Sequence, residues 1–157
     1  MHPSLHPLML ALEAAEKDRD QAHSTVLRLR HQMEAAQSQG RQLDDYRRDY
    51  QHRWGERFRQ QGTVQLMQCY HSFMARLDQA GSQQEAAVQR IQHHLDQALQ
   101  MLRERETRAA SIRKLIERRQ GEIDLARIRQ DQKATDEQAA RMAWARRAAG
   151  SNGLAMA

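Results

Sequence analysis

The chain has 157 residues, of which 29% are charged and 4% aromatic, and its mean hydropathy is −0.93. This composition excludes a thick hydrophobic core, whereas the abundance of Ala, Leu, Gln, Glu, Arg and Met favours helix. The formal net charge of +5 arises in the last third: residues 1–102 hold twelve Lys and Arg against twelve Asp and Glu, and residues 103–157 hold thirteen against eight.

The first predicted element is a helix over residues 8–57. Apolar residues recur at alternating steps of three and four from Leu8 to Trp54, a spacing typical of helices that pair along a seam. Eleven of these 14 seam positions are apolar, and the others are one Gly and two Arg. Both prolines, Pro3 and Pro7, precede the seam, so no proline interrupts the helix.

A turn is predicted over residues 58–63, centred on Gly62. The two seams of the chain are out of phase with each other, which requires a break between them, and Thr63 can cap the helix that follows. A rival turn is possible at Gly81 and Ser82, where a capping box begins. That turn would place a run of glutamines on the inner face, so the turn at Gly62 is preferred.

The second predicted helix covers residues 64–147 and is followed by a frayed tail over residues 148–157. Its seam runs from Met67 to Ala126, with 14 of 18 positions apolar. The fold class expected is therefore all-α: one domain, residues 1–157, forming a long two-helix antiparallel coiled-coil hairpin with an overhanging C-terminal helix.

Pairing the two seams in an antiparallel hairpin predicts a register in which the numbers of facing residues sum to 124. It predicts an apolar seam with one layer of two arginines and two layers in which a glycine faces a larger side chain. The pairs are Trp54 with Tyr70, Leu29 with Leu95, Arg19 with Arg105, Gly40 with Gln84, and Leu43 with Gly81.

Six of the seven aromatic residues lie within a short stretch that surrounds the predicted turn. Packing in the seam explains Tyr50 and Trp54. Tyr46 and Phe58 occupy flanking positions, where charged residues are usual. A two-helix coil has no second layer to cover such side chains, and an exposed apolar patch on a thin rod is typical of a partner site. We therefore favour docking over packing for Tyr46 and Phe73.

Two segments of the chain resemble one protein family. The first consists of Gln39, Leu43, Tyr46 and Tyr50 on the first helix with Phe73, Leu77 and Ala80 on the second. The other is DQKATDEQAAR near the C-terminus, residues 131–141. Both are similar to segments of FliJ, a flagellar type III export protein, and the resemblance covers nearly the whole chain.

The resemblance implies a non-enzymatic stalk that is similar to the central stalk of rotary ATPases. Such proteins insert the end that bears their termini into the hexameric export ATPase ring, contact the linker of the membrane export gate, and handle export chaperones. The gate-facing residues here would be Gln39, Leu43, Tyr46, Tyr50, Phe73, Leu77 and Ala80. The location implied is cytoplasmic and peripheral to the inner membrane at the flagellar base.

The overhang suits a role inside a ring, because a single basic helix can enter a pore and complement an acidic lining. The alternative for each basic residue is a solvated side chain. The candidates for contact with the ATPase ring are Arg113, Lys114, Arg118, Arg119, Arg127 and Arg129.

Other function classes remain open. A virulence type III stalk would have much the same sequence pattern, and a generic scaffolding coiled coil would dimerise. A pI of about 10.0 favours nucleic-acid binding, but acids interrupt the basic stretch and Trp144 is its one aromatic residue. We expect neither nucleic acid nor direct membrane insertion.

The sequence contains no motif of a catalytic, nucleotide or metal site, so we expect no enzyme activity, no cofactor and no metal. His93 and His94 point about 100° apart on a helix and chelate poorly. Cys69 is the single cysteine, which excludes an internal disulfide, and we expect it to pack beside the seam. The apolar runs are too short for a signal peptide or a membrane span.

Overall fold

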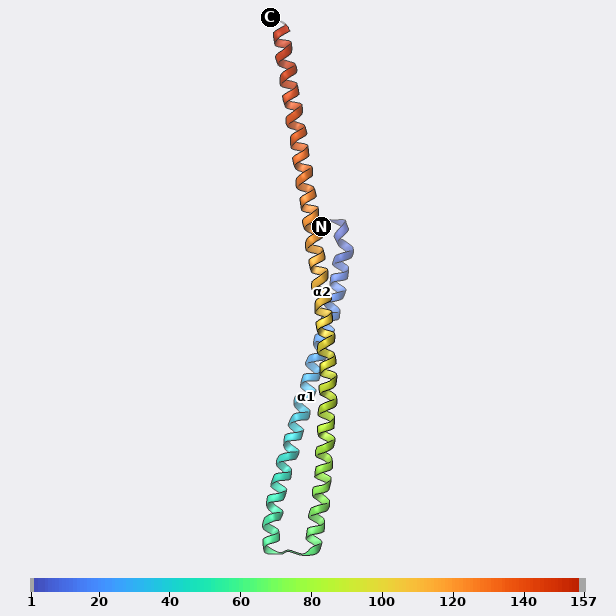
Figure 1. Cartoon of the computed structure of the whole chain (residues 1–157), viewed down its shortest axis with the longest axis vertical. Helices are drawn as coiled ribbons and strands as arrows, with labels where there is room; N and C mark the ends of the chain where they lie inside the picture. The colour runs from blue at the N-terminus through green and yellow to red at the C-terminus, as the bar shows by residue number, and fades with distance from the viewer. Residues whose placement is uncertain (1, 156–157) are drawn as a thin grey trace. The chain divides into compact units, whose positions relative to one another are not determined.

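The computed structural model describes residues 2–155. Its elements are a short 3-10 helix, η1 (Pro3–Leu5), and two long helices, α1 (His6–Gln60) and α2 (Val64–Ala155), shown in Figure 1. Contacts between the two long helices make this an all-α helical hairpin, so the predicted fold class is confirmed.

The ends of the helices follow from local chemistry. Pro7 lies in the first turn of α1, where its missing N–H is not needed. The loop between the helices, residues 61–63, includes Gly62. Thr63 caps α2 as predicted, because the backbone N–H of Leu66 donates to its Oγ1 at 3.3 Å. The rival turn is wrong, since Gly81 and its neighbours lie within α2.

At its other end α2 continues to Ala155, past Arg147, where we expected the helix to stop. Ala148 and Ala149 are strong helix formers, and the hydroxyl of Ser151 donates to the carbonyl oxygen of Ala148 at 3.0 Å. The last two residues of the predicted tail lie outside the described residues.

The chain forms two compact units, which are described separately. The hairpin unit is Ala15–Arg108, and the terminal unit combines Met1–Ala14 with Ala109–Ala157. Each unit contains a part of α1 and a part of α2.

In the hairpin unit, α1 and α2 run antiparallel on either side of the loop (Figure 1). Val26, Leu29 and Leu95 form the core, with Ala98 and its neighbours on α2 packed against them. The pairs Leu29–Leu95 and Val26–Ala98 both have residue numbers that sum to 124, the sum that the seams predict.

Two further contacts in this unit have the same sum. The ring centroids of Trp54 and Tyr70 lie 5.9 Å apart. A Cβ built on Gly40 would lie 3.7 Å from Cγ of Gln84. The predicted register therefore holds from the core of the unit to the rings beside the loop.

The predicted arginine layer is held by carboxylates. Arg105 reaches Asp18 across the helices, with Nη1 and Oδ2 3.5 Å apart. Arg19 instead pairs with Asp20 on its own helix at 3.0 Å. Two seam positions thus carry charge because each guanidinium has an acidic partner at the edge of the seam.

In the terminal unit, Leu5 is buried at 3% exposure. Together with Met9 it borders a shallow apolar pocket on α2, to which Ile116 and Gly121 contribute. From Asp124 to Gly153 every side chain is exposed. Within residues 2–155, no helix is both long and apolar enough to cross a membrane.

Candidate functional site

Six rings form an aromatic cluster next to the loop of the hairpin unit, and Tyr50 lies at its centre. The ring of Tyr50 contacts four others, with centroids 4.3 Å from Phe73, 5.7 Å from Trp54, and 6.3 Å from Tyr46 and Tyr70. The aromatic cluster consists of Tyr46, Tyr50, Trp54, Phe58, Tyr70 and Phe73.

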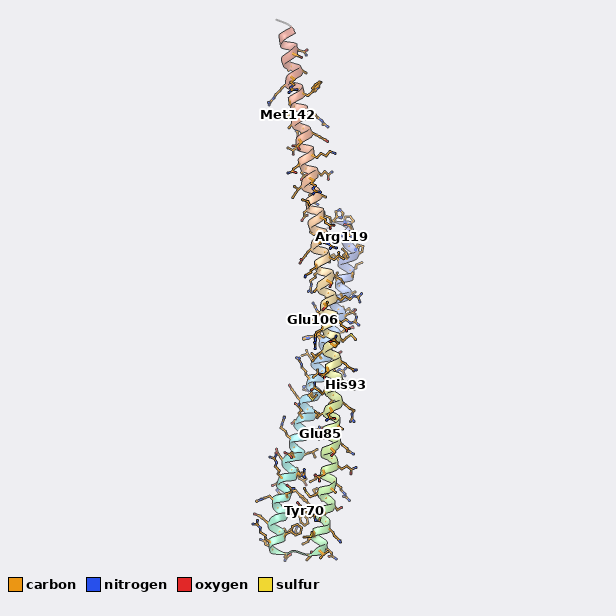
Figure 2. The ribbon with its side chains drawn as sticks, viewed as in Figure 1. Tyr70, Glu85, His93, Glu106, Arg119 and Met142 are labelled. Atoms are coloured by element: carbon orange, nitrogen blue, oxygen red, sulfur yellow. The ribbon has the colours of Figure 1, made fainter. Side chains whose placement is uncertain are left out.

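The cluster has an inner part and an outer part. Tyr70 is half-buried and lies close to the loop (Figure 2). Tyr46 lies at the outer edge and is 52% exposed, although it meets Phe73 edge-on at 6.3 Å. Ring pairs of this kind stabilise by about 0.5–1.5 kcal/mol beyond the area that they bury. The cluster therefore stabilises the closed end of the hairpin and still leaves Tyr46 exposed to solvent.

A notch between the helices adjoins the cluster. Gly40 on α1 and Gly81 on α2 supply no side chain there, which leaves a cavity of about 640 Å³. Its apolar lining comes from Leu43, Leu77 and Val88. The polar residues of the lining are Asp44, Arg47, Asp78, Ser82, Gln84 and Glu85.

Ion pairs and one hydrogen bond surround the notch. Arg47 pairs with Asp78 across the helices at 3.1 Å, and Arg48 pairs with Asp44 on α1 at 2.9 Å. The side-chain amide of Gln84 donates to the carbonyl oxygen of Ala36. The lining of the notch therefore includes both apolar side chains and side chains held in ion pairs.

The sequence of this hairpin matches one known family. The family described as "Flagellar FliJ protein" matches residues 4–149. The chain belongs to the FliJ family. No curated protein and no solved structure matches it. As a FliJ-family member the chain is a component of the flagellar protein export apparatus, in which this family has no catalytic role.

In this FliJ-family chain, five of the seven expected gate-facing residues gather at the closed end. Tyr46, Tyr50 and Phe73 belong to the aromatic cluster, and Leu43 and Leu77 line the notch. The other two belong to neither group: Gln39 is exposed and Ala80 is half-buried.

The six basic residues expected at the ATPase ring are all exposed on α2. Because successive residues on a helix turn by about 100°, these side chains point around the whole helix. Lys114, Arg118 and Arg129 share one side, Arg113 and Arg127 share another, and Arg119 lies between them. The basic segment of this FliJ-family chain is therefore charged all round, without one basic face.

Sequence reasoning missed the acidic residues of the notch and the placement of Cys69. Cys69 is exposed, contrary to our expectation, because it precedes the seam residue Tyr70 and points about 100° away from it. Asp44, Asp78 and Glu85 lie beside the seam positions and carry no motif. Among the residues described, no three His, Cys, Asp or Glu side chains gather to hold a metal.

Proposed function

We propose that this chain couples the hexameric export ATPase to the membrane export gate and assists the handling of export chaperones. In this proposal it acts as a cytoplasmic stalk, associated peripherally with the inner membrane at the flagellar base. The terminal unit contacts the ATPase ring, and the closed end of the hairpin unit contacts the gate. Membership of a flagellar family favours this role over a virulence system.

One observation supports the ring contact above all. From Asp124 to Gly153, α2 is helical and every side chain is exposed. A helix whose described side chains are all exposed, with charge on all sides, is a slender element that fits inside a ring. Its charge suits an acidic pore, since Arg127 and Arg129 are exposed on this part of α2.

The closed end supports the gate contact. Large aromatic side chains are enriched where protein surfaces bind tightly, and Tyr46 presents about half of its surface to solvent. The adjoining notch supplies a concave surface beside this exposed ring. Together they offer a partner both a flat aromatic contact and a recess.

A truncation tests the ring contact. Deleting residues 127–157 removes a segment whose side chains are all exposed over residues 127–153, and it spares Ile116, which packs near Leu5. We expect the truncated chain to keep its melting temperature and to lose stimulation of the hexameric export ATPase. Added salt should weaken stimulation by the full chain, because exposed charges are screened over about 8 Å at physiological ionic strength.

Paired charge variants provide the matched control. Arg127→Gln with Arg129→Gln should reduce stimulation, whereas Arg146→Gln with Arg147→Gln removes the same charge farther along α2 and should change it less. If the truncated chain is folded and stimulates the ATPase as well as the full chain, the proposed ring contact is wrong.

A further inference from the structure

The notch is a cavity in the seam, where two glycines contribute no side chain. A Cβ built on Gly81 would meet no atom within 4 Å, and one built on Gly40 would meet only Gln84 at 3.7 Å. A helix that contains glycine in its interior is less stable than one with alanine at that position. Replacing either glycine with alanine should therefore stabilise the chain. A Cβ therefore fits at either position without a clash, and packing within the hairpin does not require the absence of a side chain there.

The lining of the notch combines apolar and acidic side chains. Leu43, Leu77 and Val88 provide the apolar part, and three carboxylates lie among the polar residues against the single guanidinium of Arg47. Two of these carboxylates already have arginine partners. The third, Glu85, is exposed and makes no hydrogen bond or ion pair with any residue that the structure describes. Figure 2 places Glu85 on α2, farther from the loop than Tyr70.

This combination selects one type of side chain. Arginine and lysine have apolar stems that lie along hydrophobic surface and charged ends that stay at its edge. The stem would lie over Leu43 and Leu77, and the charged end would meet Glu85. Charge-assisted hydrogen bonds to a carboxylate are among the stronger polar contacts in proteins. A purely apolar or an acidic side chain would leave Glu85 unpaired or repelled.

We propose that the notch receives one arginine or lysine side chain of the protein that docks on the aromatic cluster. This inference rests on the proposed function, in which that protein is the export gate. The notch then sets which segment of the gate binds and in what register, while Tyr46 and its neighbouring rings supply the broader contact.

Filling the notch is the main test. The full-length Gly81→Leu variant is titrated calorimetrically with the purified soluble region of the gate protein. Gly55→Leu is the matched control, because Gly55 is also helical and a Cβ there meets no atom within 4 Å. We expect Gly81→Leu to weaken binding by about tenfold, and Gly55→Leu to bind like the wild type.

Thermal melting separates docking from folding. Leucine is a better helix former than glycine, so both variants should raise the melting temperature by about 2–4 °C. A variant that is more stable and yet binds less tightly has lost a docking feature. Loss of binding together with a lower melting temperature for Gly81→Leu would count against the proposal.

The charge is tested separately. Glu85→Gln should weaken gate binding several-fold in low salt and less in high salt. Asp96→Asn is its control, since Asp96 lies on the same helix outside the notch and bonds only to Gln92 among the described side chains. Replacing each arginine and lysine of the gate segment with methionine should identify one position whose effect disappears in the Gly81→Leu background. If none does, the proposed occupant is wrong.

The outcomes distinguish the notch from the gate contact itself. If Tyr46→Ala weakens gate binding and Gly81→Leu does not, the notch proposal is wrong and the proposed function stands. If the wild-type chain does not bind the gate protein at all, the proposed gate contact fails and the notch proposal with it. If sedimentation shows a wild-type dimer that Gly81→Leu dissociates, the occupant is a second copy of this chain, which also overturns the proposal.

Discussion

The aromatic cluster predicts different costs for truncating two of its rings. Tyr50 is half-buried and contacts four rings, at centroid distances of 4.3–6.3 Å. Removing a fully buried aromatic side chain costs about 3–5 kcal/mol, so the half-buried Tyr50 should cost about 2–3 kcal/mol when changed to Ala. Tyr46 is 52% exposed and contacts only two rings, so Tyr46→Ala should cost about 1 kcal/mol.

Urea unfolding followed by far-ultraviolet circular dichroism measures both costs on the full chain. Tyr50→Phe is the control, because it keeps the ring and should stay close to the wild type. The effect on affinity for the gate should not follow the effect on stability. Tyr46→Ala should weaken gate binding more than Tyr50→Ala does, although it destabilises the chain less. If Tyr46→Ala destabilises the chain as much as Tyr50→Ala does, Tyr46 is a packing residue and its assignment to docking is wrong.

Two further predictions concern the seam of the hairpin unit. Leu29→Ala should lower the free energy of unfolding by about 2–3 kcal/mol, because Leu29 is 8% exposed and packs against Val26 and Leu95. Urea unfolding measures this cost, and a value below about 1 kcal/mol would contradict the assignment of Leu29 to the core. Arg105→Ala should cost less than about 1 kcal/mol, since its ion pair with Asp18 is 3.5 Å long and both side chains are at least 35% exposed. A much larger cost, or one that does not fall with salt, would mean that this pair is more than a screened surface contact.

Helix pairing in this chain was predictable because its period is encoded locally. Apolar residues spaced by three and four from Leu8 to Trp54 define the inner face of the first helix. A second set with the same spacing, from Met67 to Ala126, defines the inner face of the second helix. The phase shift between the sets places a break near Gly62, and an antiparallel pairing then leaves few possible registers. The close approach of Gly40 to Gln84 and of Trp54 to Tyr70 follows from the same sum of residue numbers.

Side chains that flank the seam were less predictable. The spacing of the apolar residues shows that Arg105 lies in the seam. It does not show that Arg105 reaches Asp18 on the other helix. The same spacing predicts that Gly81 lies opposite Leu43. It does not predict which carboxylates line the resulting notch. These features depend on rotamers and on long side chains that cross between helices. The exposure of Cys69 was missed for a different reason, because adjacency to a seam residue in sequence is not adjacency in space on a helix.

The terminal unit raises a physical question, which is why α2 stays helical over residues 124–153, where every described side chain is exposed. An isolated helix is marginal in water chiefly because its first turn is costly to form. Here the first turn already exists, since the preceding part of α2 packs near Leu5, and each later residue only extends the helix. The residues of this extension are mostly Ala, Arg, Gln and Glu, which extend helices well, and Gln120 donates to Asp124 at 2.9 Å one turn ahead. The exposed helix therefore needs no apolar face of its own to remain helical, and its charged side chains are open to solvent on every side.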